Sequence, residues 1–309
     1  MYRKKYGGNM TDIPISDLIK KEGAELFENA PKISFTCELG KEAQYLITMN
    51  NHYISPKGQV IKTQSLSAGY KKVFQTSLTP KSAVCTYTWG DVQFHSHKWN
   101  GDAVDSSWTF AKGETFSNLV TFPEKIKSIP KDKEYKGEIG IDYSHLASTP
   151  TVNLLYMLSW DVIGLEEMAS HLARTSESIS GVGQFTEVST ISDIRAYMQF
   201  GGCKDNSFFD NGQFEMAYLG LSMCNGHLGA LYEYRCFGKL EVNNAKNKAN
   251  AQSQKGTSYY FGKVLVDIES GDLLRGDMIE LVSGVTVNKE GKLVPQQKRR
   301  FVQLELAAD

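Results

Sequence analysis

The pair Asn225-Gly226 is the feature that most constrains how this chain can fold. It is preceded by Phe214–Cys224 and followed by residues 227–236, and both arms are rich in β-favouring side chains. A two-residue type I′ turn needs positive φ at both central positions, and Asn followed by Gly meets that need readily. The pair therefore predicts a β-hairpin over residues 214–236.

Most of the remaining chain has a similar pattern. Short β-favouring segments, separated by Gly, Pro, Asn and Asp turns, fill residues 33–122 and 185–306. Residues 152–174 differ, because leucine, methionine and valine recur there at helical spacing, as one long helix or two abutting ones. Such a helix needs a sheet face to cover. The sequence predicts a mainly β (α+β) fold, with a large curved antiparallel sheet or half-barrel wrapped on one helical element.

The chain is expected to form a single domain over residues 1–309, since no internal repeat or clean linker divides it. Residues 1–14 are expected to be a flexible leader. Residues 241–255 are rich in Asn, Lys, Gln and Ala, and they are predicted to form a mobile loop.

Charge and cysteine content restrict the classes of function. The formal net charge is −1, so no overall field attracts nucleic acid or an anionic membrane. No apolar run is long enough to span a bilayer. The five cysteines form no CxxC pair, and the N-terminal residues lack the apolar segment of a signal peptide. We therefore expect a cytoplasmic protein without a nucleic-acid partner or a membrane span; the sequence specifies neither a cofactor nor an oligomeric state.

Two groups of residues are candidates for acid–base chemistry. His95 and His97 alternate in a predicted strand, so both rings lie on one face, where a metal would still need a third ligand. The alternative is that they are ordinary polar-face residues. Asp161 follows Trp160 in an apolar helical segment, where burial would raise its pKa. A helix-capping role would also account for Asp161.

Aromatic side chains suggest a binding surface. Trp89 and Trp99 belong to a cluster in the first half, and Tyr218, Tyr232 and Tyr234 to a second cluster around the hairpin. On one face of a curved sheet, such rows can line an apolar pocket, although plain core packing gives the same pattern.

The segment that follows Phe214 resembles the lipoprotein-carrier (LolA-like) half-barrel superfamily over about 90 residues. The resemblance rests on the Asn225-Gly226 hairpin ending in residues 230–234, on residues 264–267, and on residues 270–273. It implies a curved antiparallel sheet closed by a helix, and a carrier of lipids or apolar ligands. It transfers no catalytic residue.

The leading functional hypothesis is a binding protein for an apolar or aromatic small molecule in the concavity of the sheet. One alternative is an enzyme that acts on such a ligand without a nucleotide, with Asp161 or the His95/His97 pair transferring protons. Another is a structural or assembly subunit whose sheet edges pair with neighbours.

Overall fold

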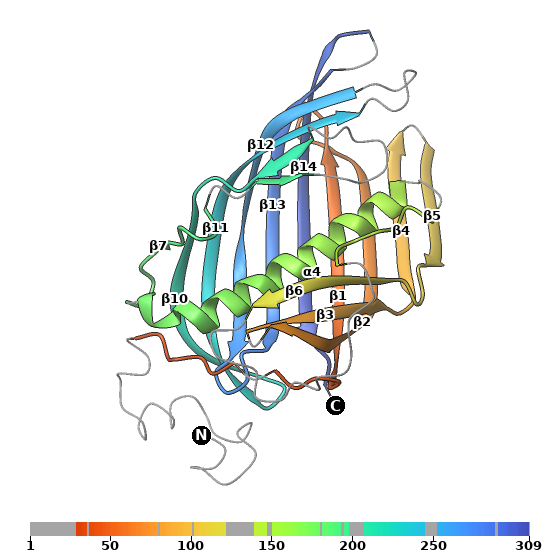
Figure 1. The fold of residues 1–309 in the computed structure, drawn as a ribbon. Coiled ribbons are helices and arrows are strands. Elements are labelled where there is room, and N and C mark those ends of the chain that lie inside the picture. Colours follow the sequence, from red (N-terminus) through yellow and green to blue (C-terminus); the bar gives the residue numbers. More distant parts are fainter. Residues whose placement is uncertain are drawn as a thin grey trace.

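The computed structural model describes residues 29–35, 37–79, 81–100, 102–121, 139–146, 150–179, 181–192, 195–197, 207–244, 252–287 and 290–308. These residues form a large open antiparallel sheet that curves around one long helix (Figure 1). The predicted fold class is confirmed. The expected leader, residues 1–14, lies outside the described residues.

The main path of the sheet follows the order β5-β4-β2-β1-β14-β13-β12-β11-β10-β7. It ends at β5 on one side and at β7 on the other, so the sheet does not close into a barrel. The strands are β1 (Glu42–Ile54), β2 (Val60–Thr79), β3 (Ser82–Trp89), β4 (Val92–Asn100), β5 (Asp102–Phe110), β6 (Thr115–Thr121), β7 (Thr186–Glu187), β8 (Arg195–Tyr197), β9 (Phe208–Asp210), β10 (Phe214–Cys224), β11 (His227–Asn244), β12 (Gln252–Asp267), β13 (Leu273–Val287) and β14 (Leu293–Leu306).

The hairpin at Asn225-Gly226 is confirmed. Both residues have positive φ, 46° and 78°, as a type I′ turn requires, and Cys224 pairs with His227 across it. The side-chain amide of Asn225 donates a hydrogen bond to the carbonyl of Leu306, 2.7 Å away. This bond ties the tip of the hairpin to the end of β14.

The segment predicted to be a mobile loop, 241–255, is partly strand. β11 and β12 remain paired from Glu241 opposite Lys255 out to Asn244 opposite Gln252. The segment lies at the far end of a long hairpin, and its Val242 and Gln254 are half-buried. Residues 245–251 lie outside the described residues.

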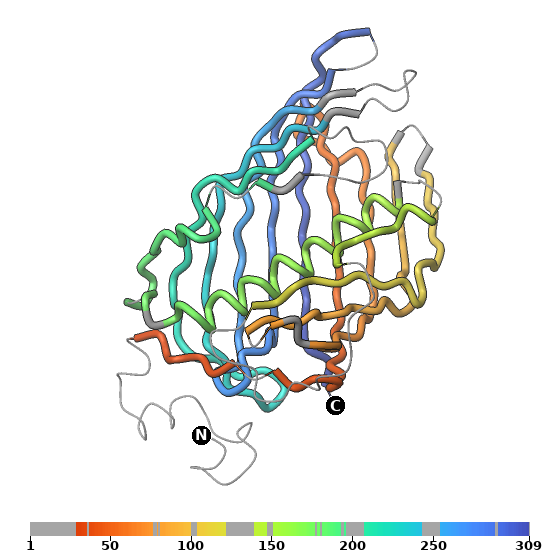
Figure 2. Tube along the Cα trace, in the orientation of Figure 1, coloured from red at the N-terminus to blue at the C-terminus, as the bar shows by residue number. Residues whose placement is uncertain are grey.

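The helix α4 (Pro150–Thr175) crosses the concave side of the sheet as one unbroken element (Figure 2). This confirms the helix predicted over residues 152–174 and decides in favour of one helix. Its Leu155, Leu158 and Val162 are fully buried. A helix that is apolar over most of its circumference must be covered on more than one side.

A branch of the sheet provides the second cover. β2 pairs with β4 through its first half and with β3 through its second half, and β3 in turn pairs with β6. α4 contacts β6 as well as β12 and β13, so it is held between the branch and the main path. Ser170 Oγ donates to the carbonyl of Thr121 in β6 at 2.9 Å.

None of the helices in the described ranges is long and apolar enough to cross a membrane.

Candidate functional site

The strands pair in register, so side chains on the concave face form rows that run across the sheet. One such row is apolar throughout its central part. Met49 of β1 lies beside Val302 of β14, which lies beside Met278 of β13, and on the other side Met49 lies beside Leu66 of β2. All four side chains are buried against the core beneath α4.

The adjacent row is polar, and we call it the polar row. It consists of Ser96 of β4, Gln64 of β2, Asn51 of β1, Arg300 of β14, Glu280 of β13 and Tyr260 of β12.

Burial makes the polar row costly unless its groups find partners. Tyr53 Oη donates to the Gln64 side chain at 2.8 Å, and Tyr260 Oη donates to the Asn211 side chain at the same distance. Asn51 is fully buried, and the described residues give its side-chain amide no hydrogen-bond partner. The row therefore retains unused hydrogen-bonding capacity next to Arg300.

Arg300 is held by carboxylates from two elements. Its Nη1 lies 2.5 Å from Asp161 Oδ2 of α4, and its Nε lies 2.7 Å from Glu280 Oε2 of β13. Ser258 Oγ donates to the other oxygen of Glu280 at 2.6 Å. The guanidinium thus joins the helix to the sheet by charge-assisted hydrogen bonds.

The two carboxylates share one guanidinium, and their pKa values are displaced in opposite directions. Burial raises the pKa of Asp161 to about 6, against the lowering influence of Arg300. For Glu280 burial also opposes ionisation, but Arg300 and Lys298 outweigh it and lower the pKa. Of the two, Asp161 is the group that takes up a proton first as the pH falls.

A basic row lies next to the polar row, toward the start of β14. Its members, in order across the sheet, are Lys98 of β4, Lys62 of β2, Tyr53 of β1 and Lys298 of β14. The ammonium of Lys62 lies 5.1 Å from the centre of the Tyr53 ring, and burial together with Lys98 lowers the pKa of Lys62. Burial and the neighbouring guanidinium of Arg300 lower the pKa of Lys298 to about 8.

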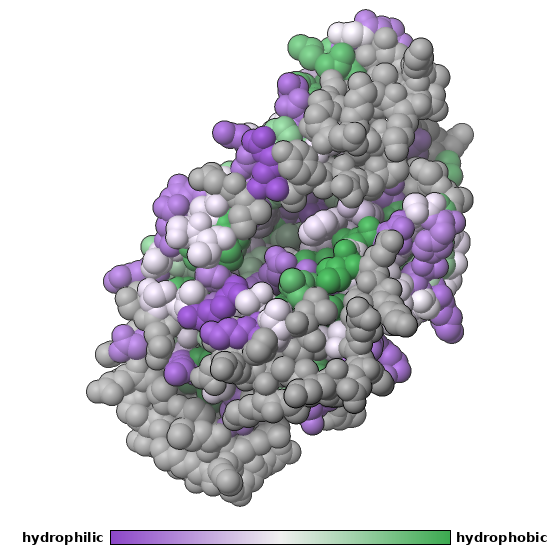
Figure 3. Space-filling model, in the orientation of Figure 1, coloured by the Kyte–Doolittle hydropathy of each residue, from purple (hydrophilic) through white to green (hydrophobic). Residues whose placement is uncertain are grey.

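A cavity of about 560 Å³ lies along α4, between the helix and strands β12–β14. Its lining is largely apolar and includes Met157, Trp160 and Met168 of the helix. Asp161, Glu280, Lys298 and Arg300 provide charged groups in the same lining. Figure 3 shows apolar residues in the recessed middle of this face, with hydrophilic residues around them. Pockets of roughly 300–1,000 Å³ with a few convergent polar groups are typical small-molecule sites.

Gly164 is the position at which the helix leaves room for the cavity. It lies in the middle of α4 and lines the cavity, and a Cβ built on it would meet no atom within 4 Å. A mid-helix glycine costs about 1 kcal/mol relative to alanine. Here the absent side chain leaves space beside the sheet.

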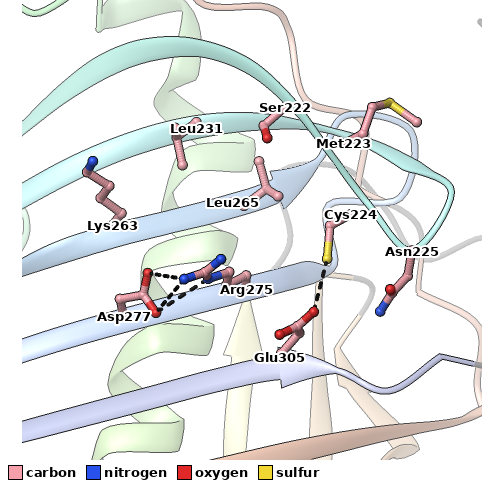
Figure 4. Close-up of a pocket in the computed structure, with 10 residues that line it drawn as sticks. All are labelled: Ser222, Met223, Cys224, Asn225, Leu231, Lys263, Leu265, Arg275, Asp277 and Glu305. Carbon is pink, nitrogen blue, oxygen red and sulfur yellow. Dashed lines mark hydrogen bonds and ion pairs between the residues drawn. The ribbon is translucent and has the colours of Figure 1, made fainter. Parts of the chain in front are cut away.

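A second cavity, of about 490 Å³, lies beside the hairpin on the opposite face of the sheet (Figure 4). Its charged groups neutralise one another: Arg275 pairs with Asp277 at 3.2 Å. Burial and Glu305 raise the pKa of the Cys224 thiol, which makes it a poor nucleophile. This cavity is therefore a weaker candidate for a functional site than the cavity beside α4.

The structure separates the two candidates for acid–base chemistry. Asp161 lines the cavity beside α4, with its carboxylate bound by Arg300. His95 and His97 lie on the outer face of β4, on the side opposite the buried Phe94, and both are near Asp105 at 3.8 and 2.6 Å. Within the described residues, no cluster of three or more His, Cys, Asp or Glu is suited to holding a metal.

The aromatic residues predicted to bind a ligand lie outside the cavity lining. Tyr218, Tyr232 and Tyr234 are fully buried on the concave face, and Tyr234 Oη donates to the carbonyl of Asp277. Trp89 is buried and donates from Nε1 to Tyr143 Oη at 2.8 Å. Trp99 is 48% exposed on the outer face of β4, against the ring of His97.

The fold and cavity define an open antiparallel sheet wrapped on one helix, with an internal amphipathic space. No protein-family model matches the chain, and no curated protein matches it in sequence. A lipovitellin structure, described as showing lipid–protein interactions, aligns with 88% of this chain at 11% identity and a TM-score of 0.40; the chain spans 25% of that chain's length. A putative exported protein with a YmcC-like fold from Bacteroides fragilis aligns with 89% of this chain and 99% of its own, at 10% identity and a TM-score of 0.19.

These likenesses are too distant to carry an inference about function, and they add nothing specific to the lipoprotein-carrier resemblance.

Sequence reasoning identified Asp161 and missed most of its surroundings. Glu280, Lys298 and Arg300 are each one charged residue among several in alternating strands, and only the register of β13, β14 and β1 brings them together. Gly164 was the one signal within reach, because a glycine inside an otherwise strong helical pattern points to a packing or functional reason.

Proposed function

We propose that this protein binds an elongated apolar small molecule in the cavity between α4 and strands β12–β14. The observation that carries the proposal is the cavity itself, which remains open although the rest of the concave face is packed. An apolar ligand that enters it gains the free energy of removing apolar surface from water, about 25 cal/mol per Å².

The lining supports a ligand of variable shape. Met157 and Met168 are unbranched and polarisable, so they can adapt to different apolar surfaces. Trp160 is 43% exposed, which is a large apolar area for a helix that lies against a sheet. A bound ligand would cover it.

Filling the cavity from Gly164 tests the proposal. The Gly164→Phe side chain would project into the cavity, so we expect it to weaken binding of the neutral dye N-phenyl-1-naphthylamine at least about tenfold, a loss of about 1.4 kcal/mol. Fluorescence titration of the purified full chain measures the change.

Gly164→Ala is the matched control. It adds only a methyl group, so the dye should still bind, and the helix should gain up to about 1 kcal/mol of stability. If Gly164→Phe is folded by circular dichroism and binds the dye as well as the unmodified protein does, the cavity is not the binding site.

A further inference from the structure

We infer that the ligand carries an anionic group, a carboxylate or a phosphate at one end of its apolar body, and that Lys298 binds this group. The inference rests on the proposed function and specifies the chemistry of the ligand at that site. It is carried by the position of Lys298 in the cavity lining and by the pairing of the other charged groups there.

Lys298 differs from the other cations that line the cavity. Arg300 is engaged by Asp161 and Glu280, and Arg174 donates to the carbonyl of Thr121. The described residues give the ammonium of Lys298 no hydrogen-bond or ion-pair partner, although it lines a largely apolar cavity. Lys298 is half-buried, and an ammonium partly removed from water is stabilised by an anion that compensates its charge.

The pairing of the other charged groups leaves Lys298 open to an anion. Within the polar and basic rows the cations are Lys62, Lys98, Lys298 and Arg300, and the one carboxylate is Glu280. Lys62 and Lys98 lie outside the cavity lining, which itself holds, among the described residues, three cations, Arg174, Lys298 and Arg300, and three carboxylates, Asp161, Glu167 and Glu280. Asp161 and Glu280 bind Arg300, and Glu167 accepts a hydrogen bond from Asn118, so Lys298 is the cation of the lining with which an incoming anion can pair.

The arrangement also orients the ligand. The basic row lies beyond the polar row, whereas Met278 and Leu165 lie on the apolar side of it, and both line the cavity. Asn51 adds an unpartnered amide beside Arg300 in the polar row. An amphipathic ligand can therefore place its chain against the apolar rows and its charged end at Lys298.

Displacement of N-phenyl-1-naphthylamine by oleate and by oleyl alcohol tests the inference, because the two share a chain and differ in charge. We expect oleate to displace the dye at concentrations at least about tenfold lower, as befits a charge-assisted hydrogen bond. Lys298→Met should reduce this preference to about twofold or less. An oleoyl lysophosphatidate arm shows whether a carboxylate or a phosphate is the better end group.

The control is Lys263→Met, an exposed lysine on the outer face of β12 that lines the second cavity, and it should keep the preference for oleate. Equal displacement by the acid and the alcohol, or a preference that survives in Lys298→Met, would overturn the inference while the proposed function stood. Failure of both compounds and the dye to bind would overturn the proposed function itself. Lys298→Gln keeps the comparison available if the methionine variant does not fold.

Discussion

Replacing Lys72 with methionine is expected to lower the free energy of unfolding by about 3–5 kcal/mol, the largest loss that we expect from a single substitution in this fold. Lys72 of β2 is 4% exposed and its Nζ lies 2.7 Å from Oε2 of Glu166 in α4, which is also buried. Asp272 approaches the same ammonium at 3.6 Å. Burial alone would lower the pKa of Lys72, but the two carboxylates outweigh it and raise that pKa.

The expected loss of stability is large because the Glu166 carboxylate remains buried after Lys72 is replaced. The other oxygen of Glu166 already has no hydrogen-bond partner among the described residues, so removing Lys72 leaves a buried charge without compensation. Equilibrium unfolding in urea at pH 7 measures the loss. The double variant Lys72→Met with Glu166→Met should recover most of it, because apolar side chains can replace a buried ion pair at little cost.

Lys71→Met is the matched control for this prediction. Lys71 is the neighbouring residue, and it pairs with Glu42 at 3.0 Å with about half of each side chain exposed. Exposed pairs contribute at most about 1 kcal/mol. A Lys72→Met loss no larger than that of Lys71→Met would show that the buried pair does not hold α4 to β2.

The second large effect is expected at Arg300, where methionine should cost about 3 kcal/mol at pH 7. The substitution leaves the buried carboxylates of Asp161 and Glu280 without their guanidinium partner, although Lys298 lies close enough to offset part of their charge. Arg299→Met, on the exposed outer face of β14, is the control and should be nearly neutral. Urea unfolding of the two variants makes the comparison.

The pH dependence of Arg300→Met has a definite sign. Loss of the guanidinium raises the pKa values of both carboxyls in the folded state above those in the unfolded chain, so the folded state binds more protons and gains stability as the pH falls. Asp161 already has a pKa of about 6. The stability deficit of Arg300→Met should therefore shrink between pH 7 and pH 5, and a deficit that grows over this range would contradict the assignment of the buried charges.

The elements of this fold could be predicted where local chemistry decides them. Asn225-Gly226 specifies a turn by its backbone requirement alone, and the leucine spacing over residues 152–174 specifies a helix whatever surrounds it. The sheet register depends instead on contacts between residues far apart in the chain, such as Asn51 beside Arg300. For that reason the polar and basic rows were not visible from the sequence.

The aromatic residues that the sequence suggested as a pocket wall do not line the cavity beside α4. Tyr232 and Tyr234 alternate as a pocket wall would, but both are fully buried in the hydrophobic core, and the Tyr234 ring stacks on that of Phe214. His95 and His97 share a face as expected, and that face is the outer one. Alternation shows which residues share a face, whereas the position of the helix decides which part of the inner face stays open.

The central claim is that an apolar molecule binds between α4 and strands β12–β14, and photo-crosslinking tests it most directly. The full chain would be labelled with an aliphatic acid that carries a diazirine in mid-chain, then digested and mapped by mass spectrometry. We expect labels in residues 157–168 of α4 and 278–282 of β13, and their loss in Gly164→Phe but not in Gly164→Ala. Labels confined to the outer face around Leu231 and Leu265, or equal labelling of both Gly164 variants, would contradict the account.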